Sequence, residues 1–340
     1  AAEEAQKYAS LGDLPLAGGG VIRGCRVGYR TFGTLNEQKS NAVLFPTWFT
    51  GTSKDLEALI GPEPGKLADP SRFFVIAVDA LANGVSSSPS NSAAQPRLRF
   101  PRVTIADMVN SQRRLVQEVF GIRKLHAVIG ISMGGMQAFE WAVSHPQLLD
   151  RAVSIAGSPQ LTSADLLLWS AQLRAIQEHK DYRDGEYGQR PEIVSLTLLH
   201  QFALVSPAYR AAMTPRSGFE KYSAAARERD LARAFDPNDR VRQLEAMMSH
   251  DVGARWGGSL ARAAAEVRAR MLIVVSMQDP MVNPATSLEF ARLLRTSPVR
   301  VDTGCGHLVF KCAAESVAPP VSAFLTEGLP RARFFEDLLK

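Results

Sequence analysis

A serine lies within Gly130-Ile131-Ser132-Met133-Gly134, which matches the G-x-S-x-G pattern of nucleophilic serines. The apolar run of residues 125–131 before it predicts a buried strand, and residues 136–143 after it predict a helix. A serine on a sharp turn between a strand and a helix exposes its hydroxyl, and the flanking glycines let the two segments approach. We therefore predict that Ser132 is a nucleophile and that the Met133 amide helps to bind an oxyanion.

A serine hydroxyl becomes a good nucleophile only when a neighbouring base accepts its proton. In chains with this motif the acid and then the histidine follow the serine. Six histidines are present; His126 precedes the serine, His145 ends a predicted helix, and His179 and His200 fall in a helical region. His307 directly follows the last predicted strand, on a loop that contains two glycines. We predict that His307 is the base, with His250 as the alternative.

The acid that orients this histidine is expected after a late strand. Asp279 follows the predicted strand 271–275 in the loop Ser276-Met-Gln-Asp-Pro280. Because the carboxyl ends of parallel strands share one edge of a sheet, this position favours Asp279 as the acid. Asp302, at the end of the strand before His307, and Asp251 are the alternatives.

The second oxyanion donor is expected in the loop after the predicted strand 42–45. The backbone amide of Phe49, or that of Trp48, is the candidate. The two aromatic rings either form a wall of the acyl pocket or belong to the hydrophobic core.

Buried strands and helices alternate along much of the chain, which predicts an α/β fold with a mostly parallel sheet and helices on both faces. In such sheets ligands bind at the carboxyl ends of the strands, where the loops of Ser132, Asp279 and His307 fall. The predicted strands of the parallel part are 42–45, 73–78, 125–131, 152–155, 271–275 and 299–301.

The chain divides into a lead-in, a core and an insertion. Residues 1–19 are predicted to be a polar lead-in, followed by a hairpin of strands 21–25 and 26–34. Residues 161–250 have a helical period, breaks at glycine and proline, and no convincing strand, so they predict a helical lid. The core then consists of residues 20–160 and 251–340.

Composition argues against several classes of partner. No stretch has the roughly 18 consecutive apolar residues that a membrane-spanning helix needs. The net charge is +5, but basic residues are interleaved with acidic ones, so neither nucleic acid nor a membrane is expected as a partner. Cys25, Cys305 and Cys312 have no metal-site spacing. Buried free thiols are expected, with a pair between Cys305 and Cys312 as the alternative for an exported protein.

The first residues, Ala1-Ala2-Glu3-Glu4, resemble the mature end that remains after cleavage at a small-residue site. We therefore expect a periplasmic or secreted protein. An artificially trimmed N-terminus, and with it a cytoplasmic location, is the alternative.

Four longer sequence segments carry a resemblance to a known family: residues 29–36 (YRTFGTLN), 73–76 (FFVI), 104–109 (TIADMV) and 130–141 (GISMGGMQAFEW). With them the chain resembles the homoserine O-acetyltransferase branch of the α/β-hydrolase family, well over residues 20–157 and moderately over 268–325. This resemblance implies an α/β-hydrolase fold with a helical lid. It also implies a triad of Ser132, Asp279 and His307 and an oxyanion hole made by the amides of Phe49 and Met133.

The sequence departs from those acetyltransferases at two places. They usually have His-Ala-Leu-Thr-Gly where this chain has residues 47–51, and an aspartate that meets the acceptor's amino group where this chain has Leu308. An amine that enters a closed site without a carboxylate partner loses hydration and gains little. We assign Trp48, Thr50 and Leu308 to the substrate pocket. Arg174 of the lid is assigned to a substrate carboxylate, with an ordinary surface arginine as the alternative.

We therefore predict a serine carboxylesterase that hydrolyses small esters through an acyl-enzyme and needs no metal or organic cofactor. The alternative is an acetyl-CoA-dependent O-acyltransferase acting on homoserine or another alcohol. A catalytically idle binding scaffold is a third hypothesis. The resemblance also suggests a homodimer, because relatives of this type are often dimers.

Overall fold

The computed structural model describes residues 4–328, in which eight strands form one central sheet. These strands are β1 (Lys7–Pro15), β2 (Val21–Phe32), β3 (Ala42–Pro46), β4 (Phe74–Val78), β5 (Leu125–Ile131), β6 (Leu149–Ile155), β7 (Arg270–Ser276) and β8 (Val299–Val301). Their order in space is β1-β2-β4-β3-β5-β6-β7-β8. The pairs β1–β2 and β2–β4 are antiparallel and the others are parallel. The predicted mostly parallel α/β sheet is thus confirmed.

Helices cover both faces of the sheet, because side chains along a buried strand alternate between two hydrophobic cores. In β3, Ala42 and Leu44 belong to one core, whereas Val43 and Phe45 belong to the other. The first core includes side chains of α2 (Ile105–Arg114), α3 (Met133–Ser144), α9 (Leu260–Glu266) and α10 (Ala285–Leu293). The second includes side chains of α1 (Ser53–Leu56), α11 (Val309–Cys312) and α12 (Ala314–Thr326).

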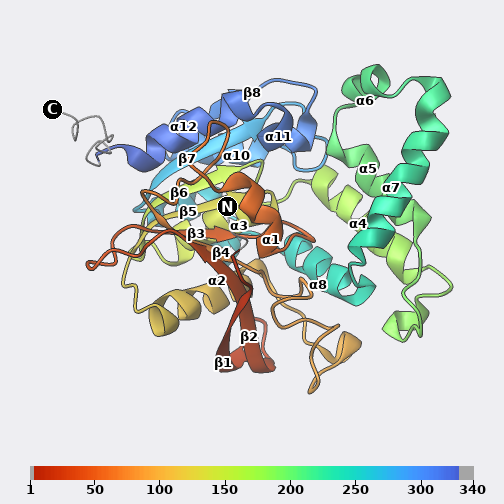
Figure 1. Cartoon of the computed structure of the whole chain (residues 1–340), viewed down its shortest axis with the longest axis horizontal. Helices are drawn as coiled ribbons and strands as arrows, with labels where there is room; N and C mark the ends of the chain where they lie inside the picture. Colours follow the sequence, from red (N-terminus) through yellow and green to blue (C-terminus); the bar gives the residue numbers. More distant parts are fainter. Residues whose placement is uncertain (1–3, 329–340) are drawn as a thin grey trace.

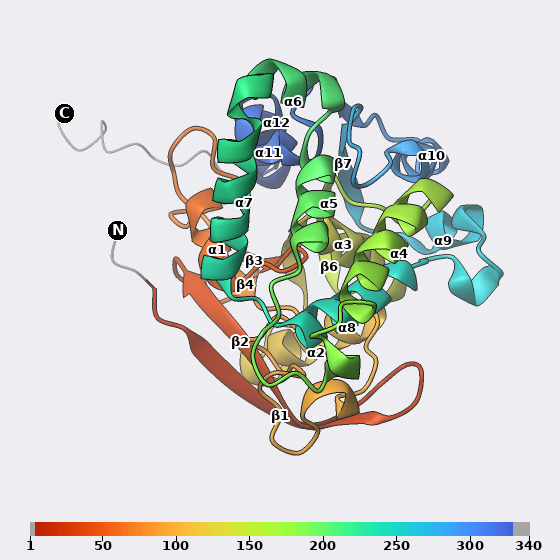
Figure 2. The ribbon, with the colours of Figure 1, turned by 90° about the vertical axis from the view of Figure 1, so that its right-hand side faces the viewer.

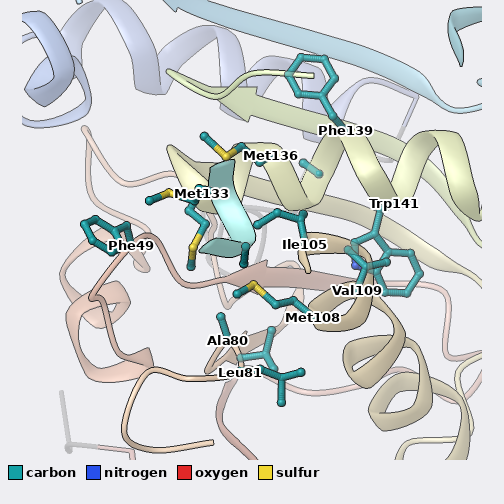
Figure 3. Packing of buried hydrophobic residues seen from close by; sticks show 14 of the residues in the cluster. Phe49, Ala80, Leu81, Ile105, Met108, Val109, Met133, Met136, Phe139 and Trp141 are labelled. Atoms are coloured by element: carbon teal, nitrogen blue, oxygen red, sulfur yellow. The ribbon is translucent and has the colours of Figure 1, made fainter. Parts of the chain in front are cut away.

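The helix α3 is buried along almost its whole length, from Met133 to Val143. Its side chains pack among those of α2 and of the segment after β4, as Figure 3 shows for Met136, Trp141 and Met108. A helix that is buried all round is held by its neighbours on every side. The N-terminus of α3, which follows the predicted nucleophile, is therefore fixed in the core.

A group of helices lies between β6 and β7 and contains no strand within residues 161–250, which we call the lid. Its helices are α4 (Ser163–Gln177), α5 (Val194–Leu204), α6 (Pro207–Met213), α7 (Phe219–Arg233) and α8 (Pro237–Met248). Figure 1 shows them together on one side of the sheet, and Figure 2 shows α4, α5, α7 and α8 spread across that side. The lid begins and ends at one place, because Gln160 and Asp251 form an antiparallel bridge.

Short helical turns complete the described structure. A π-helical turn at Leu115–Val119 extends α2, and the 3-10 turns are Glu57–Leu59, Arg97–Arg99, Arg183–Gly185, Arg216–Gly218, Ala254–Trp256 and Gly306–Leu308. Within residues 4–328 no single helix has the length and apolar character to cross a membrane. Only the bent pair Gly306–Cys312 and Ala314–Thr326, 74° apart, passes that test when its two parts are joined.

The prediction of a polar lead-in over residues 1–19 is wrong for most of that stretch, and residues 1–3 lie outside the described structure. Lys7–Pro15 form β1, an edge strand that buries Ala9 and Leu11 on alternate positions and pairs with β2. The predicted hairpin is also displaced. Residues 21–32 form one continuous strand, and the turn that precedes it contains Gly19 and Gly20 in left-handed conformations.

Cys305 and Cys312 are joined in a disulfide, and Cys25 is a buried free thiol. The expectation of free thiols is therefore wrong for the first two residues. Their Cα atoms are 6.1 Å apart, within the range that a disulfide spans. The bridge closes the turn that carries His307.

Candidate active site

Ser132 occupies a strained turn between β5 and α3. Its φ of 56° and ψ of −122° lie outside the usual regions for a residue with a side chain. A Cβ atom on Gly130 would lie 1.8 Å from the Gly134 carbonyl oxygen, and one on Gly134 would lie 2.7 Å from the Pro46 oxygen. The Ser132 amide donates a hydrogen bond to the Ile155 carbonyl of β6. Glycine is thus required on both sides of the serine, and the turn is held against two neighbouring strands.

A chain of hydrogen bonds joins Ser132, His307 and Asp279. The Ser132 Oγ lies 2.8 Å from Nε2 of His307, whose Nδ1 lies 2.7 Å from Oδ2 of Asp279. The other oxygen of Asp279 accepts hydrogen bonds from the amides of Met281 and Val282. A carboxylate held in this way accepts the Nδ1 proton and leaves the Nε2 lone pair free to accept the serine proton. The three side chains are buried.

The alternative base and acids lie elsewhere. The His250 ring is buried with its Nε2 2.9 Å from the Ser158 carbonyl oxygen, and burial lowers the pKa of His250 to about 4. Asp302 is exposed and accepts a hydrogen bond from Gln278, while Asp251 accepts one from the amide of Gly253. The structure therefore brings His307 and Asp279, and not these residues, to the serine.

The loop after β3 presents two backbone amides that have no hydrogen-bond acceptor in the described part of the chain, those of Trp48 and Phe49. The Thr50 amide, in contrast, donates to Oε1 of Gln243. Met133 is the first residue of α3, so its amide has no partner in the preceding turn of the helix. The close approach of Gly134 to Pro46 places the two segments side by side. These amides are the donors available to a developing oxyanion.

A buried amide network behind this loop had no signal in the sequence. The Gln137 side chain donates to the carbonyl oxygens of Thr47 and Met133, each at 3.1 Å, and accepts a hydrogen bond from Gln112. Gln112 accepts in turn from the indole N–H of Trp141. One side chain thus ties both sources of the oxyanion-binding amides together.

Three segments of the lid are each attached to a different loop of the site. In α4, Asp165 accepts a hydrogen bond from the amide of Asn283, four residues after Asp279. The segment after α5 is joined to the loop of His307, because the Ser206 amide donates to the Gly304 carbonyl. In α8, Gln243 holds the oxyanion loop through the Thr50 amide. The lid therefore fixes the acid, base and oxyanion loops together.

The residues assigned to the substrate pocket are divided between the site and the surface. Trp48 packs against Phe310 with ring centroids 5.6 Å apart, and Thr50 is buried in the oxyanion loop with a φ of 60°. Leu308 is half-buried directly after His307. Arg174 lies on the outer side of α4, 71% exposed and 3.8 Å from Glu178. The structure does not bring Arg174 to the site, because the buried face of α4 carries other residues.

Three side chains of the lid lie around Phe49 instead, and sequence reasoning did not single them out. The ring of Phe49 lies 5.6 Å from that of Trp169 and 6.2 Å from that of His200, and the Arg240 guanidinium lies 5.6 Å from its centroid. Gln172 follows Trp169 on the same buried stripe of α4. The residues Asp165, Trp169, Gln172 and Ile176 have helical spacing and therefore share one face of α4. Polar residues at two of these positions, Asp165 and Gln172, were the sequence signal that could have pointed to this face.

No cluster of three or more His, Cys, Asp or Glu side chains able to hold a metal ion is present among residues 4–328. The groups of the site are arranged to transfer protons and to stabilise negative charge on oxygen.

Comparison with known proteins finds a family model and relatives that agree with the geometry of this site. The family model described as alpha/beta hydrolase fold matches residues 43–312. A probable esterase of Corynebacterium glutamicum is 31% identical over 330 residues, which cover 94% of each chain. An ethyl acetate hydrolase of Pseudomonas veronii is 32% identical over 86% of this chain and 85% of its own.

The chain is also similar to a homoserine O-acetyltransferase of Thermobifida fusca, with 33% identity over 92% of each chain. Among solved structures, an acetylester hydrolase from Corynebacterium glutamicum superimposes with a TM-score of 0.86 and 29% identity, over 94% of this chain and 96% of that one. Esterases and acetyltransferases therefore share this architecture.

Proposed function

The chain belongs to the α/β-hydrolase family, and we infer that it is a carboxylic ester hydrolase that works through an acyl-serine intermediate. The observation that carries this inference is the hydrogen-bonded chain from Ser132 through His307 to Asp279. Esterases among the relatives support the same reaction. The roles of the individual residues follow from this geometry.

In the first half of the reaction Ser132 attacks the ester carbonyl carbon. Its proton passes to Nε2 of His307, and the buried Asp279 carboxylate stabilises the imidazolium that forms. The carbonyl oxygen becomes an oxyanion that accepts hydrogen bonds from the amides of Phe49 and Met133. As the tetrahedral intermediate collapses, His307 returns the proton to the leaving alcohol and the acyl group stays on the serine.

In the second half a water molecule replaces the alcohol. His307 accepts a proton from this water, whose oxygen attacks the acyl carbon. The same amides stabilise the second tetrahedral intermediate. Collapse returns the proton to Ser132 and releases the carboxylic acid.

The acyl group that fits this proposal is short. The named substrates of two relatives are ethyl acetate and an acetyl ester, and we propose that this chain also favours acetyl esters. Trp48 and Phe49 lie on the loop that faces the acyl carbonyl, and large rings there limit the room for a long chain.

The alternative function, acyl transfer from acetyl-CoA, is supported by the acetyltransferase relatives. It requires an alcohol acceptor that is held beside the acyl-serine. Leu308 follows the proposed base and offers no charge or hydrogen bond to an amino group. We therefore favour hydrolysis over acyl transfer as the function of this chain.

One comparison of assays separates the two functions. Release of acetate from 4-nitrophenyl acetate and ethyl acetate is measured beside release of CoA from acetyl-CoA with homoserine. We expect rapid ester cleavage and slow, acceptor-independent CoA release. Fast CoA release that strictly requires homoserine, with esters barely cleaved, would reverse the assignment.

Labelling by a fluorophosphonate probe tests the nucleophile. The wild-type chain should be labelled and Ser132→Ala should not, with ester turnover reduced by about 10⁴-fold or more. Labelling that persists in Ser132→Ala would place the nucleophile elsewhere.

We also propose a homodimer that forms through the lid. Large apolar side chains are exposed there, with Leu167 at 73%, Phe202 at 70% and Met213 at 62%. Exposed apolar side chains of this size on neighbouring helices are typical of protein interfaces. Light scattering coupled to gel filtration should give twice the 37.0 kDa chain mass, and Phe202→Ser should shift the protein toward monomer.

A further inference from the structure

A surface cavity of about 440 Å³ lies where the lid rejoins the core. Its walls come from the first turns of α2, the C-terminal half of α3 and the segment after α8, in which Asp251 pairs with Gln160. The wall residue Glu140 follows Ser132 by eight positions in α3, which corresponds to about 12 Å along the helix axis. The cavity is therefore separate from the site of Ser132.

Glu140 places a carboxylate in this cavity without a positively charged partner. The residue is only 8% exposed; its Oε1 accepts a hydrogen bond from the Ser144 hydroxyl, whereas its Oε2 accepts none and forms no ion pair in the described part of the chain. Arg255, at the exposed rim, donates instead to the Ser144 hydroxyl at 3.3 Å. Burial raises the pKa of Glu140, and the neighbouring Asp107 and Asp251 raise it further. A buried carboxylate in this position favours a cation as its partner.

His145 and Asp251 add further acceptors to the same cavity. The His145 ring packs against that of Trp141 with centroids 5.4 Å apart, and its nitrogens have no hydrogen-bond partner among residues 4–328. Burial and nearby arginines lower the pKa of His145 to about 4, so at neutral pH the ring is neutral and one nitrogen keeps a free lone pair. Oδ1 of Asp251 accepts a hydrogen bond from the Gly253 amide, whereas its Oδ2 accepts none from the described residues.

The chemistry of these groups indicates the kind of ligand. Two carboxylate oxygens and an imidazole lone pair can only accept hydrogen bonds, so a matching ligand group donates several and carries positive charge. A primary ammonium group has three N–H donors and one positive charge. A metal ion matches less well, because no cluster of three or more His, Cys, Asp or Glu side chains able to hold one is present among residues 4–328.

We propose that this cavity binds the primary ammonium group of a small organic amine, with Glu140 as its counter-ion and His145 and Asp251 as hydrogen-bond acceptors. The ligand is distinct from the ester, so the proposal does not depend on the proposed hydrolysis. A bound amine would join α3 to the segment that closes the lid, because Asp251 also forms the bridge to Gln160.

The test compares three ligands that share a butyl chain. Butylammonium has both the charge and the N–H donors, butyltrimethylammonium keeps the charge without the donors, and butan-1-ol is neutral. In calorimetric titration of the wild type, the Kd of butylammonium should be at least tenfold lower than that of either other ligand. No measurable binding of butylammonium, or equal binding of butyltrimethylammonium, would overturn the proposal.

Variants show whether the named residues hold the amine. Glu140→Gln should raise the Kd of butylammonium at least tenfold, and Asp251→Asn and His145→Phe about threefold each. Glu228→Gln is the matched control, because it removes a negative charge from an exposed position of α7 and should leave the Kd unchanged. An unchanged Kd in Glu140→Gln, or an equal rise in Glu228→Gln, would exclude the site.

The Glu140 variant is expected to fold. Glutamine can still accept the hydrogen bond from Ser144 and removes a buried charge, so thermal unfolding of Glu140→Gln without amine should occur at or above the wild-type temperature. If this variant does not fold, Asp251→Asn and His145→Phe decide the question, and an unchanged Kd in both would refute the site.

Blocking Ser132 distinguishes this cavity from the ester site. Butylammonium should bind with the same Kd after the fluorophosphonate probe has labelled Ser132, because the cavity lies elsewhere on α3. Loss of binding after labelling would place the amine beside Ser132 and overturn the proposal. A chain that the probe does not label would count against the proposed hydrolysis alone, and the Kd in Glu140→Gln would still decide the amine site.

Discussion

Replacing Gln137 by leucine should damage catalysis although this side chain touches no reacting atom. In the wild type its amide holds the carbonyl oxygens of Thr47 and Met133 and accepts a hydrogen bond from Gln112. A leucine of similar size leaves the Thr47 oxygen and the Gln112 amide group without their partner in a region that is fully buried. The loop that carries Phe49 would then lose one of its attachments to α3.

The cost to stability follows from the number of groups left unpaired. Two buried groups at about 1–3 kcal/mol each give about 2–6 kcal/mol. Unfolding entropy scales with chain length, and for 340 residues each kcal/mol corresponds to about 1.4 °C. Thermal unfolding of Gln137→Leu should therefore occur about 3–8 °C below that of the wild type.

The cost to catalysis follows from the oxyanion amides. Complete loss of one such donor lowers kcat by about 10²–10³-fold, so a displaced loop should lower it by about 10–100-fold. The amides strengthen their hydrogen bonds as the oxyanion forms, so KM should change much less than kcat. Steady-state kinetics with 4-nitrophenyl acetate measures both constants.

A second buried polar group provides the control. Ser111 in α2 donates a hydrogen bond to the Met108 carbonyl within its own helix. Ser111→Ala should lose stability and keep kcat within about twofold. If Gln137→Leu loses the expected stability but keeps its kcat, the loop is held by its other bonds, such as those of Thr47 to Val78 and Ala80, and the reasoning is refuted.

Three further predictions concern the triad and its surroundings. Asp279→Asn should lower kcat by about 10³–10⁴-fold, because an amide cannot hold the required tautomer of His307; kinetics and circular dichroism would show a folded but slow enzyme. Leu308→Asp should leave ester cleavage within an order of magnitude, and a complete loss in the same assay would mean that the pocket is misplaced. The lowered pKa of His250, about 4, means that the unfolded chain, with a pKa near 6.5, binds this proton first as the pH falls. The free energy of unfolding should thus drop by up to about 3 kcal/mol between pH 6.5 and 4 from this group, and denaturant titrations should show a smaller drop in His250→Gln.

The triad could be predicted from the sequence because the fold restricts where its members lie. Ser132 and Asp279 follow strongly apolar strands and His307 follows the short strand Val299–Val301, and parallel strands end at one edge of a sheet. The chain order then left few candidates for each role. The hydrogen bonds among these residues are consistent with that reasoning.

Features that depend on packing between distant segments were not predictable in this way. The strand Lys7–Pro15 was missed because polar residues and Gly12 interrupt its alternation, and only pairing with β2 makes it a strand. The inward face of α4 was likewise uncertain, because the helix has apolar residues on several sides, including the exposed Leu167. Which of its faces meets Phe49 is decided by the rest of the lid.

The balance between hydrolysis and transfer depends on what can be held beside the acyl-serine. An alcohol competes with water only if binding gives it a large effective concentration and a fixed orientation. After His307 this chain has Leu308, which cannot pair with an ammonium group. An amino alcohol that finds no partner at this position gains no effective concentration over water. Water needs no recognition to act as the acceptor, and so the acyl group on Ser132 is left to be hydrolysed.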